Sequence, residues 1–492
     1  MDVPSSLLNT LDIEAALLEE IEYPLPYLPP SIMTRAVAPR VAEAAAYFTG
    51  LYRKEIDVAQ AEIVQVRKSG NGLRPVAVVD FPTRVLFRAL CNHLAPHLEP
   101  LDRSWNAKQR SEREPLESGP SHIVIADVTA FYDFVDHAIL EEELIAQTGE
   151  AEVVEVIVTL LRNVMGRKFG LPQVLYPSNV LSEIYIDIAE RRLVRSGFSV
   201  WRYIDDFRLT ATTWRNANDA LDGLNSVIRD LGLTLNENKL HVLTAEVYRD
   251  WLEKPDRIWR TITEEVKIDL RPGDGYMEDT EAEGDIPDEE LRAAAAPKAL
   301  ELALTDPSTD RLEQSVNRLL ARSALYSLTR VRSESALPQI VSLMRREPQL
   351  SADVARYLRA AAGVNESNVA ATCSLVIGDP GVHLSDWQSL WLLEAIRELN
   401  ELPADIGKWI SAIVSGNGPD IVRARAALTL AESEAISFEE IAELYGTVVP
   451  ASRPDTIAAA ALVAQADDPR LRTIERDTKP NSWIVELTRN EH

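Results

Sequence analysis

Two adjacent aspartates, Asp205 and Asp206, are the residues of this sequence whose types and spacing most directly suggest chemistry. They follow Tyr203 and Ile204 in a run rich in β-branched and aromatic residues, which predicts a tight β-hairpin with both carboxylates at its tip. Two unpaired carboxylates held together in a half-buried setting are unfavourable unless a cation lies between them. The pair therefore indicates a cation site, and the alternative is an ordinary acidic turn.

A third aspartate, Asp127, ends the short apolar run at 123–126. A run without polar alternation predicts a strand that is buried on both faces, so Asp127 stands where a carboxylate can emerge from a sheet. The alternative is that Asp127 caps a helix or forms a turn, as single aspartates at strand ends usually do.

The elements that must position these aspartates follow one another in an informative order. Around the strand and the hairpin, helices are expected at about 138–147, 152–164, 178–195 and 217–231, with a last strand after 239. This order is that of a ferredoxin-like split β-α-β sheet, in which the end of the first strand lies beside the hairpin tip. Three carboxylates at one sheet edge suit a hard divalent cation such as Mg²⁺. Two such ions can clamp the attacking and leaving oxygens of a phosphoryl transfer.

Basic residues flank a second predicted hairpin nearer the N-terminus. Alternating strands surround the Asn-Gly-type turn at 69–72, which is a strong hairpin signal. Arg67, Lys68 and Arg74 bracket this turn, where they could hold a phosphate chain together. The alternative is a solvated hairpin with basic gatekeeper residues.

Composition narrows the class of protein. The 492 residues have a net charge of −26, which argues against a general positive coat for nucleic acid but allows a local basic path. No apolar run reaches the ~18 residues of a membrane span, and the N-terminus lacks the pattern of a secretory signal. Cys91 and Cys373 are expected to be buried free thiols. We therefore expect a cytoplasmic protein without a membrane partner.

Shifts in composition indicate the domain boundaries. We expect an N-terminal helical region at 1–60, an α+β domain at 61–255, an acidic linker at 273–292 and an all-α domain at 293–492. Residues 102–121 are polar and are predicted to form a loop. The last domain has Ala- and Leu-rich helical segments without a strict period, which favours a HEAT-like helical repeat over the alternative of a compact bundle.

Over roughly residues 61–245 the sequence resembles the reverse transcriptases. Five blocks stand in the order of that family: Arg67, Lys68 and Arg74 of the fingers; Asp127 with Phe131 and Tyr132; Gly170 to Gln173 with Ser178; Tyr203 to Asp206, similar to the Tyr-x-Asp-Asp signature; and Gly232 and Leu233 with Lys239. The resemblance implies fingers and a palm, the palm being the ferredoxin-like sheet. One departure is Val174, since the family usually has Gly there, which lets the backbone approach a base or template closely.

The resemblance also implies a role for each of these residues. The metal-binding residues would be Asp127, Val128, Asp205 and Asp206, holding Mg²⁺ or Mn²⁺, and the catalytic residues would be Asp127, Asp205, Asp206 and Lys239, the last near the leaving pyrophosphate. The incoming dNTP would be bound by Arg67, Lys68, Arg74, Phe131, Tyr132 and Gln173. Tyr132 would be the steric gate against a ribose 2′-hydroxyl.

A palm followed by a helical-repeat half resembles, in particular, bacterial reverse transcriptases of the abortive-infection and other defence-associated (unknown group) type. The resemblance implies protection against phage, homo-oligomers such as trimers or hexamers, and, as in some members, DNA made without a template and attached covalently to a protein hydroxyl. Candidates for that hydroxyl are Tyr326, Tyr357 and Tyr445, and the alternative for each is a core position. Two other functions remain open: reverse transcription of a cognate noncoding RNA, and a helical-repeat scaffold with a vestigial palm.

Overall fold

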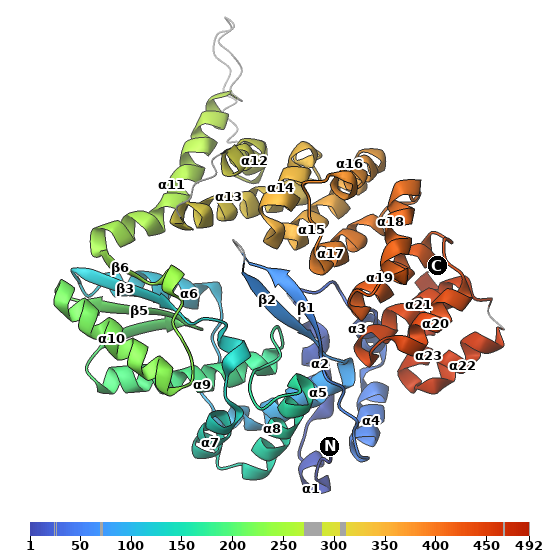
Figure 1. Ribbon diagram of the computed structural model, residues 1–492, viewed down its shortest axis with the longest axis horizontal. Coiled ribbons are helices and arrows are strands. Elements are labelled where there is room, and N and C mark those ends of the chain that lie inside the picture. The colour runs from blue at the N-terminus through green and yellow to red at the C-terminus, as the bar shows by residue number, and fades with distance from the viewer. Residues whose placement is uncertain are drawn as a thin grey trace, which may run out of the picture.

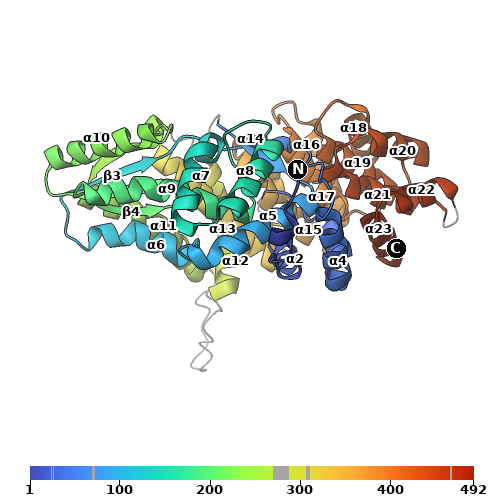
Figure 2. The same ribbon diagram turned by 90° about the horizontal axis from the view of Figure 1, so that it is seen from below.

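The computed structural model describes residues 1–23, 25, 27–68, 72–269, 288–305, 311–465 and 468–491. It shows a sheet-containing domain from which a curved row of helices extends to the N-terminal region (Figures 1 and 2). The predicted turn at 69–72 and the predicted acidic linker at 273–292 lie largely outside these residues. Helix α12 (Asp288–Thr305) begins within the range expected for the linker.

The N-terminal region consists of short helices followed by a hairpin. Its elements are α1 (Ser5–Leu8), α2 (Ile13–Glu22), α3 (Ile32–Val37), η1 (Ala38–Arg40), α4 (Val41–Tyr52), β1 (Glu62–Arg67), β2 (Leu73–Val78), α5 (Phe81–Leu94) and η2 (Ala95–His97), where η denotes a 3₁₀ turn. Strands β1 and β2 pair antiparallel, which confirms the predicted basic hairpin. Cys91 of α5 and Cys373 are buried free thiols, as predicted.

The four-stranded sheet has the strand order of a ferredoxin-like fold, as predicted. Its strands are β3 (His122–Asp127), β4 (Ser199–Tyr203), β5 (Asp206–Ala211) and β6 (His241–Thr244), in the order β4-β5-β3-β6 with every pair antiparallel. Helices α7 (His137–Thr148), α8 (Ala151–Met165) and α9 (Tyr176–Arg195) connect β3 to β4, and α10 (Trp214–Asp230) connects β5 to β6. The end of β3 therefore lies at the β4–β5 turn.

The two faces of this sheet are covered by different elements. Val124 and Leu209 belong to the main core, on which α9 and α10 pack. Ile123 and Ile125 point to the other face, where they pack against Tyr248 of α11 (Ala245–Asp269) in a smaller cluster. Burial on both faces explains why β3 is a continuous apolar run in the sequence.

The prediction of a loop at 102–121 is wrong. Helix α6 (Trp105–Arg113) and the turn η3 (Glu114–Leu116) occupy this segment, and α6 lies against β4. Ser104 begins the helix, because its hydroxyl accepts a hydrogen bond from the Ala107 amide at 3.1 Å. The helix has one buried residue, Ser111, so an apolar periodicity that could have revealed it is absent.

The C-terminal half is helical throughout its described residues. After α12 its elements are α13 (Arg311–Arg330), η6 (Leu337–Gln339), α14 (Ile340–Arg346), η7 (Pro348–Leu350), α15 (Ser351–Ala362), α16 (Glu366–Gly378), α17 (Asp386–Ile396), α18 (Ala404–Ser415), α19 (Asp420–Glu432), α20 (Phe438–Thr447), η8 (Pro450–Ser452), α21 (Arg453–Val463), α22 (Pro469–Asp477) and α23 (Lys479–Glu491). From α13 to α23 the odd-numbered helices pack side by side in one layer, and α14, α16 and α18 pack in a second. Within the described ranges, no helix combines the length and apolarity that a membrane crossing requires.

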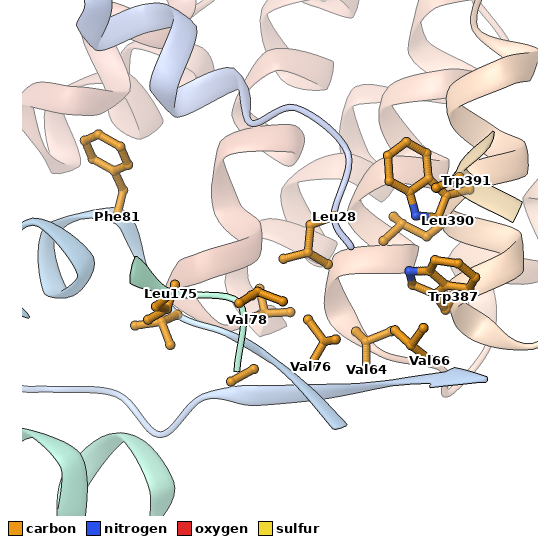
Figure 3. Close-up of a cluster of buried hydrophobic side chains, with 14 of the residues drawn as sticks. Leu28, Val64, Val66, Val76, Val78, Phe81, Leu175, Trp387, Leu390 and Trp391 are labelled. Carbon is orange, nitrogen blue, oxygen red and sulfur yellow. The ribbon is translucent and has the colours of Figure 1, made fainter. Parts of the chain in front are cut away.

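The basic hairpin packs against the helical half. Val64 and Val76, on one face of the hairpin, are buried in the same core as Trp387 and Trp391 of α17 (Figure 3). Both indole N–H groups donate to the carbonyl oxygen of Tyr27, at 2.7 Å from Trp387 and 3.2 Å from Trp391. The segment around Tyr27 is thus held to the helical half by hydrogen bonds, and the hairpin is held there by apolar burial.

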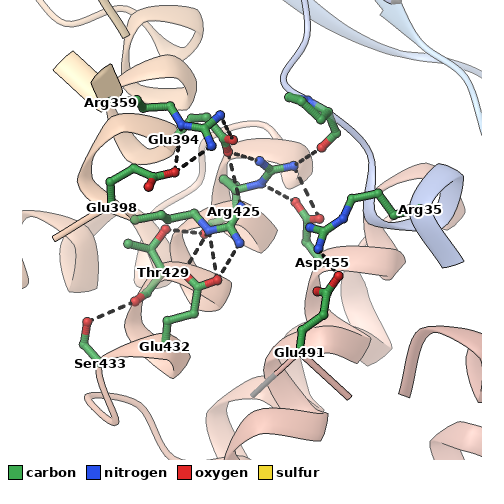
Figure 4. Close-up of polar contacts among 12 residues, drawn as sticks. Arg35, Arg359, Glu394, Glu398, Arg425, Thr429, Glu432, Ser433, Asp455 and Glu491 are labelled. Atoms are coloured by element: carbon green, nitrogen blue, oxygen red, sulfur yellow. Dashed lines mark hydrogen bonds and ion pairs between the residues drawn. The ribbon is translucent and has the colours of Figure 1, made fainter. Parts of the chain in front are cut away.

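A buried arginine, Arg425 of α19, connects the helical layer to the N-terminal region (Figure 4). Its guanidinium bonds to Asp455, at 2.7 Å, and to Glu394, and its Nη2 donates to the carbonyl oxygen of Pro30 at 3.2 Å. A buried guanidinium is tolerated only when its charge and donors have partners. This network therefore fixes the N-terminal segment at Pro30 against helix α19 of the C-terminal half.

Candidate active site

The structure brings the three predicted aspartates together at one edge of the four-stranded sheet. Asp127, the last residue of β3, lies opposite Asp206, the first residue of β5. Tyr203 pairs with Asp206 to close the β4–β5 hairpin, so Asp205 lies in its two-residue turn. The Val128 amide donates to the Asp205 carbonyl oxygen at 3.2 Å, which holds the turn against the end of β3.

The hairpin turn is strained at Ile204. Its φ is 60°, in the left-handed region that β-branched residues avoid. Arg202 holds the turn in place: its Nη1 donates to the Ile204 carbonyl oxygen at 2.9 Å, and its Nε donates to Glu190 of α9 at 2.8 Å. A residue in this region costs about 1–3 kcal/mol, which the surrounding contacts must offset. Strain of this kind is typical of a site that must present a side chain in one direction.

The carboxylate cluster carries negative charge that few groups compensate. Burial raises the pKa of Asp205 to about 7, and the neighbouring Asp127 and Asp206 add to the shift. Burial also raises the pKa of Asp206, against the opposing charge of Arg208. Lys239 donates to Asp127 Oδ1 at 2.7 Å. Burial would lower the pKa of Lys239, but Asp127 and the other two carboxylates outweigh burial and raise it.

The donor set fits a hard divalent cation, because carboxylate oxygens are the ligands that Mg²⁺ and Mn²⁺ prefer. In the part of the chain that the structure describes, no three His, Cys, Asp or Glu side chains already form a group that could hold a metal ion. Mutual repulsion between carboxylates accounts for this, as does the ion pair of Asp127 with Lys239. The three aspartates would have to converge on an ion as it binds. Val128 could contribute only through its backbone, since its side chain is buried and apolar.

The predicted sugar gate, Tyr132, is fixed by a network that the sequence did not reveal. Its hydroxyl accepts from Arg103 at 2.7 Å and from Ser182 at 3.2 Å, and donates to Asn179 at 2.8 Å. Arg103 also donates to the Asn179 carbonyl oxygen and to the Ser182 hydroxyl. The Arg103 carbonyl accepts from the Tyr203 hydroxyl at 3.0 Å, so the same residue contacts the β4–β5 hairpin. Arg103 is a single arginine in a polar stretch of sequence. The sequence therefore did not indicate that it holds Tyr132.

Phe131, predicted to bind the nucleotide, lies in the core instead. It is 2% exposed, and its ring meets Tyr132 edge to face at 5.6 Å and Tyr185 at 6.4 Å between centroids. An enclosed ring cannot contact a bound nucleotide. The ring of Phe131 therefore packs against Tyr132, and a contact of Phe131 with the nucleotide through its backbone stays a prediction.

Of the predicted phosphate-binding residues, Arg74 interacts electrostatically with Asp205 and Asp127 of the carboxylate cluster. Its guanidinium lies 4.8 Å from the centre of the Tyr27 ring and donates to the Tyr27 hydroxyl. Burial lowers the pKa of Arg74, and Asp205 is foremost among the acids that oppose this shift. Arg67 is the last residue of β1, opposite Leu73. Tyr27 was not among the predicted site residues, because a tyrosine in a Pro-rich segment is ordinarily structural.

Gln173 contacts a fourth carboxylate, Asp133, on which Lys68 acts electrostatically. The Gln173 amide donates to Asp133 at 3.3 Å. Burial raises the pKa of Asp133, while Gln173, Arg167 and Lys68 act in the opposite direction. The structure therefore places Gln173 and the end of the basic hairpin on the same side of the candidate site.

Val174, where the family usually has Gly, has the backbone conformation of a glycine. Its φ is 76° and its side chain is 8% exposed. The left-handed conformation is free of strain for Gly and costs about 1–2 kcal/mol for other residues. Val174 thus has a conformation that glycine adopts without strain, and its side chain is buried.

The three predicted priming tyrosines lie on helices of the C-terminal half. Tyr357 of α15 is fully buried and its hydroxyl accepts from the Ala336 amide at 3.0 Å. Tyr445 of α20 donates to Asp477 at 2.6 Å. Tyr326 of α13 is 63% exposed. Tyr357 is therefore a core residue, which was the alternative to a priming role. Its hydroxyl cannot reach a reactive centre without local unfolding.

The geometry of the site indicates a class of protein. An acidic cluster on a ferredoxin-like sheet, with a lysine beside it, is suited to nucleotidyl transfer. Residues 66–268 match the family described as reverse transcriptase (RNA-dependent DNA polymerase). The match runs from the last two residues of β1 through nearly all of α11 and includes the whole four-stranded sheet. These residues form a reverse transcriptase domain, and the chain is an enzyme of the polymerase nucleotidyltransferase class.

Among solved structures, the chain is similar to telomerase from Candida tropicalis in complex with a TWJ fragment of telomeric RNA. The two share 10% sequence identity with a TM-score of 0.30, over 75% of this chain and 67% of that chain. A TM-score of this size does not define a common fold for the whole chain. No curated protein matches the sequence.

The raised pKa of Asp205 predicts a pH dependence of stability in metal-free protein. Between pH about 4 and about 7 the folded state binds more protons at Asp205 than the unfolded state, whose carboxyl titrates near 3.8. The free energy of unfolding should therefore fall as pH rises through this window, by up to about 4 kcal/mol at ~1.4 kcal/mol per pKa unit. Urea denaturation in EDTA at several pH values measures this, and Asp205→Asn should flatten the dependence. Identical pH profiles for the two proteins would contradict the assignment.

The positive φ at Val174 predicts an inverted ranking of two substitutions. Val174→Gly should be more stable than Val174→Ala by about 1 kcal/mol, because only Gly adopts this conformation without strain. At Val180, inside α9, the ranking should be the ordinary one, with Ala more stable than Gly by about 1 kcal/mol. Chemical denaturation of the four variants measures both differences. An Ala variant as stable as the Gly variant at 174 would show that the position is unstrained.

Proposed function

We propose that this chain is a cytoplasmic DNA polymerase of antiphage defence, which adds dNTPs by two-metal phosphoryl transfer. The observation that carries the proposal is the meeting of Asp127 with the strained hairpin of Asp205 and Asp206 inside a reverse transcriptase domain. Bound Mg²⁺ or Mn²⁺ would stabilise the charge that develops on the phosphoryl oxygens. The three aspartates would hold the ions, and relief of their repulsion would favour binding.

Lys239 has the properties that the proposed reaction requires. In the present geometry it neutralises Asp127, and its side chain is 57% exposed. With Asp127 engaged as a cation ligand, Lys239 would be available to pair with the leaving pyrophosphate. Its raised pKa keeps the ammonium group charged at neutral pH. Arg74 and Lys68 would bind the incoming triphosphate.

We further propose synthesis without a template, primed by a protein hydroxyl. The architecture supports it, since a palm continues into a helical half that we interpret as a HEAT-like repeat from the side-by-side stacking of α13 to α23. Tyr326 is the predicted hydroxyl best exposed for such a role. Repeat surfaces of this kind also suit assembly, and we propose a homo-oligomer, a trimer or hexamer.

A second candidate function is reverse transcription of a cognate noncoding RNA. The geometry at Val174 favours it, because the backbone there has a conformation that glycine adopts freely and the side chain is buried. Incubation of the pure protein with labelled dNTPs, with and without RNA, separates the candidates. Product attached to protein without RNA supports the first function, and product that requires RNA supports the second. No product in either condition would favour a scaffold with a vestigial palm.

The carboxylate assignment predicts the behaviour of a double variant. Asp205→Ala with Asp206→Ala should abolish dNTP incorporation while the protein stays folded, because the cation ligands are lost and their repulsion is relieved. Incorporation of labelled dNTPs and thermal unfolding measure the two effects. The matched control is Asp219→Ala with Asp222→Ala, two exposed aspartates of α10, which should leave activity unchanged. Full incorporation by the Asp205/Asp206 variant would exclude the assignment.

The gate assignment predicts a change in sugar selectivity. Tyr132→Ala should lower the preference for dNTP over rNTP by about 10-fold or more, since the ring that would exclude a 2′-hydroxyl is removed. Tyr132→Phe keeps the ring and should retain most of the preference. The ratio of kcat/KM for the two nucleotides measures selectivity. An unchanged ratio in Tyr132→Ala would remove the residue from this role.

A further inference from the structure

Two exposed aromatic rings lie beside the candidate active site. Phe134 and Phe169 are 50% and 37% exposed, and their rings are parallel within 3°, with centroids 6.3 Å apart. The Arg167 guanidinium lies over the Phe169 ring, 4.5 Å from its centre. We call these three residues the aromatic platform. Two large apolar side chains paired at the surface, with a cation on one ring, are not explained by burial.

The aromatic platform is rigid. The segment of Phe134 and the segment of Phe169 are joined by main-chain hydrogen bonds from Gly170 to Val135 at 2.8 Å, from Leu171 to Tyr132 at 2.7 Å and from His137 to Lys168 at 3.3 Å. The buried His137 ring also bonds to the Gly170 carbonyl oxygen at 2.7 Å. The rings are therefore presented by a fixed backbone, which limits the conformational entropy that a ligand would have to remove.

The aromatic platform adjoins the residues proposed to bind the nucleotide. Arg167 donates to the Asp133 carbonyl oxygen at 3.4 Å, and Gln173 donates to the Asp133 side chain. Lys68 at the end of the basic hairpin acts on the same carboxylate. Lys168, next to Phe169, is exposed. Aromatic faces and basic side chains thus occur together at this edge of the site, on a chain whose net charge is −26.

We infer that the aromatic platform binds an unpaired base of a single-stranded nucleic acid next to the active site, with the base stacked on Phe134 or Phe169 and the phosphates near Arg167 and Lys168. Base stacking on aromatic side chains is worth about 1–3 kcal/mol per base and tolerates any sequence, because every base has a π face. The inference rests on the proposed polymerase function. It adds a strand-binding surface that the metal site and the nucleotide-binding residues do not supply.

Fluorescence anisotropy with labelled single-stranded oligonucleotides tests the inference, in EDTA and without dNTPs. Phe134→Ala with Phe169→Ala should weaken binding of oligo-dT, oligo-rU or both by about 10-fold, and Phe134→Tyr with Phe169→Tyr should restore it. An abasic oligonucleotide of the same length should bind both proteins equally, since it offers charge without bases. Trp214→Ala, which removes an exposed aromatic side chain on α10 (57% exposed), is the matched control and should leave affinity unchanged.

The two oligonucleotides distinguish the source of the strand. A loss confined to oligo-dT assigns the aromatic platform to a DNA product, and a loss that includes oligo-rU assigns it to an RNA strand. Equal affinities of the wild type and the double Ala variant, or an equal loss with the abasic strand, would overturn the inference. Because binding is measured without synthesis, a wild type that binds through the rings but incorporates no dNTP would refute only the proposed function.

Discussion

The repulsion among Asp127, Asp205 and Asp206 is the constraint on which the rest of the structure depends. Strand pairing places Asp127 opposite Asp206, and the turn adds Asp205, whose pKa rises to about 7. Such a cluster destabilises the fold unless a ligand compensates its negative charge. In the present geometry Lys239 supplies one positive charge. The strain at Ile204 adds a further cost at the same point. Charge repulsion and backbone strain that occur together at one place indicate a functional site.

The surrounding elements hold the groups that would act on the nucleotide. Arg202 fixes the strained turn to α9, and Arg103 joins Tyr132 to the catalytic hairpin. The basic hairpin is buried against Trp387 and Trp391, so Arg74 is carried by an element that the helical half immobilises. The helical half thus holds the hairpin that carries Arg74, whereas the acidic cluster lies on the four-stranded sheet. This arrangement favours preformed surroundings for a ligand, although the three aspartates would still have to converge on an ion.

The sheet and the acidic cluster could be predicted because their signals are local: an apolar run ending in Asp127, a hairpin ending in two aspartates, and helices of the right order. What sequence reasoning missed depends on contacts between distant segments. Arg103 and Tyr27 act through partners about 30 to 80 residues away, and α6 has no apolar period because only one of its residues is buried. Phe131 was assigned to nucleotide binding from its place in the block with Asp127 and Tyr132, and only the fold shows that its ring faces the core.

The central claim is that these carboxylates form a divalent-cation site, and Mn²⁺ binding followed by electron paramagnetic resonance tests it most directly. The wild type should bind Mn²⁺, and Asp127→Asn should weaken that binding by about 10-fold or more, because it removes a ligand charge while Lys239 stays in place. Asp133→Asn, a nearby carboxylate outside the cluster, should bind as the wild type does. Equal Mn²⁺ affinity for the wild type and Asp127→Asn would contradict the account.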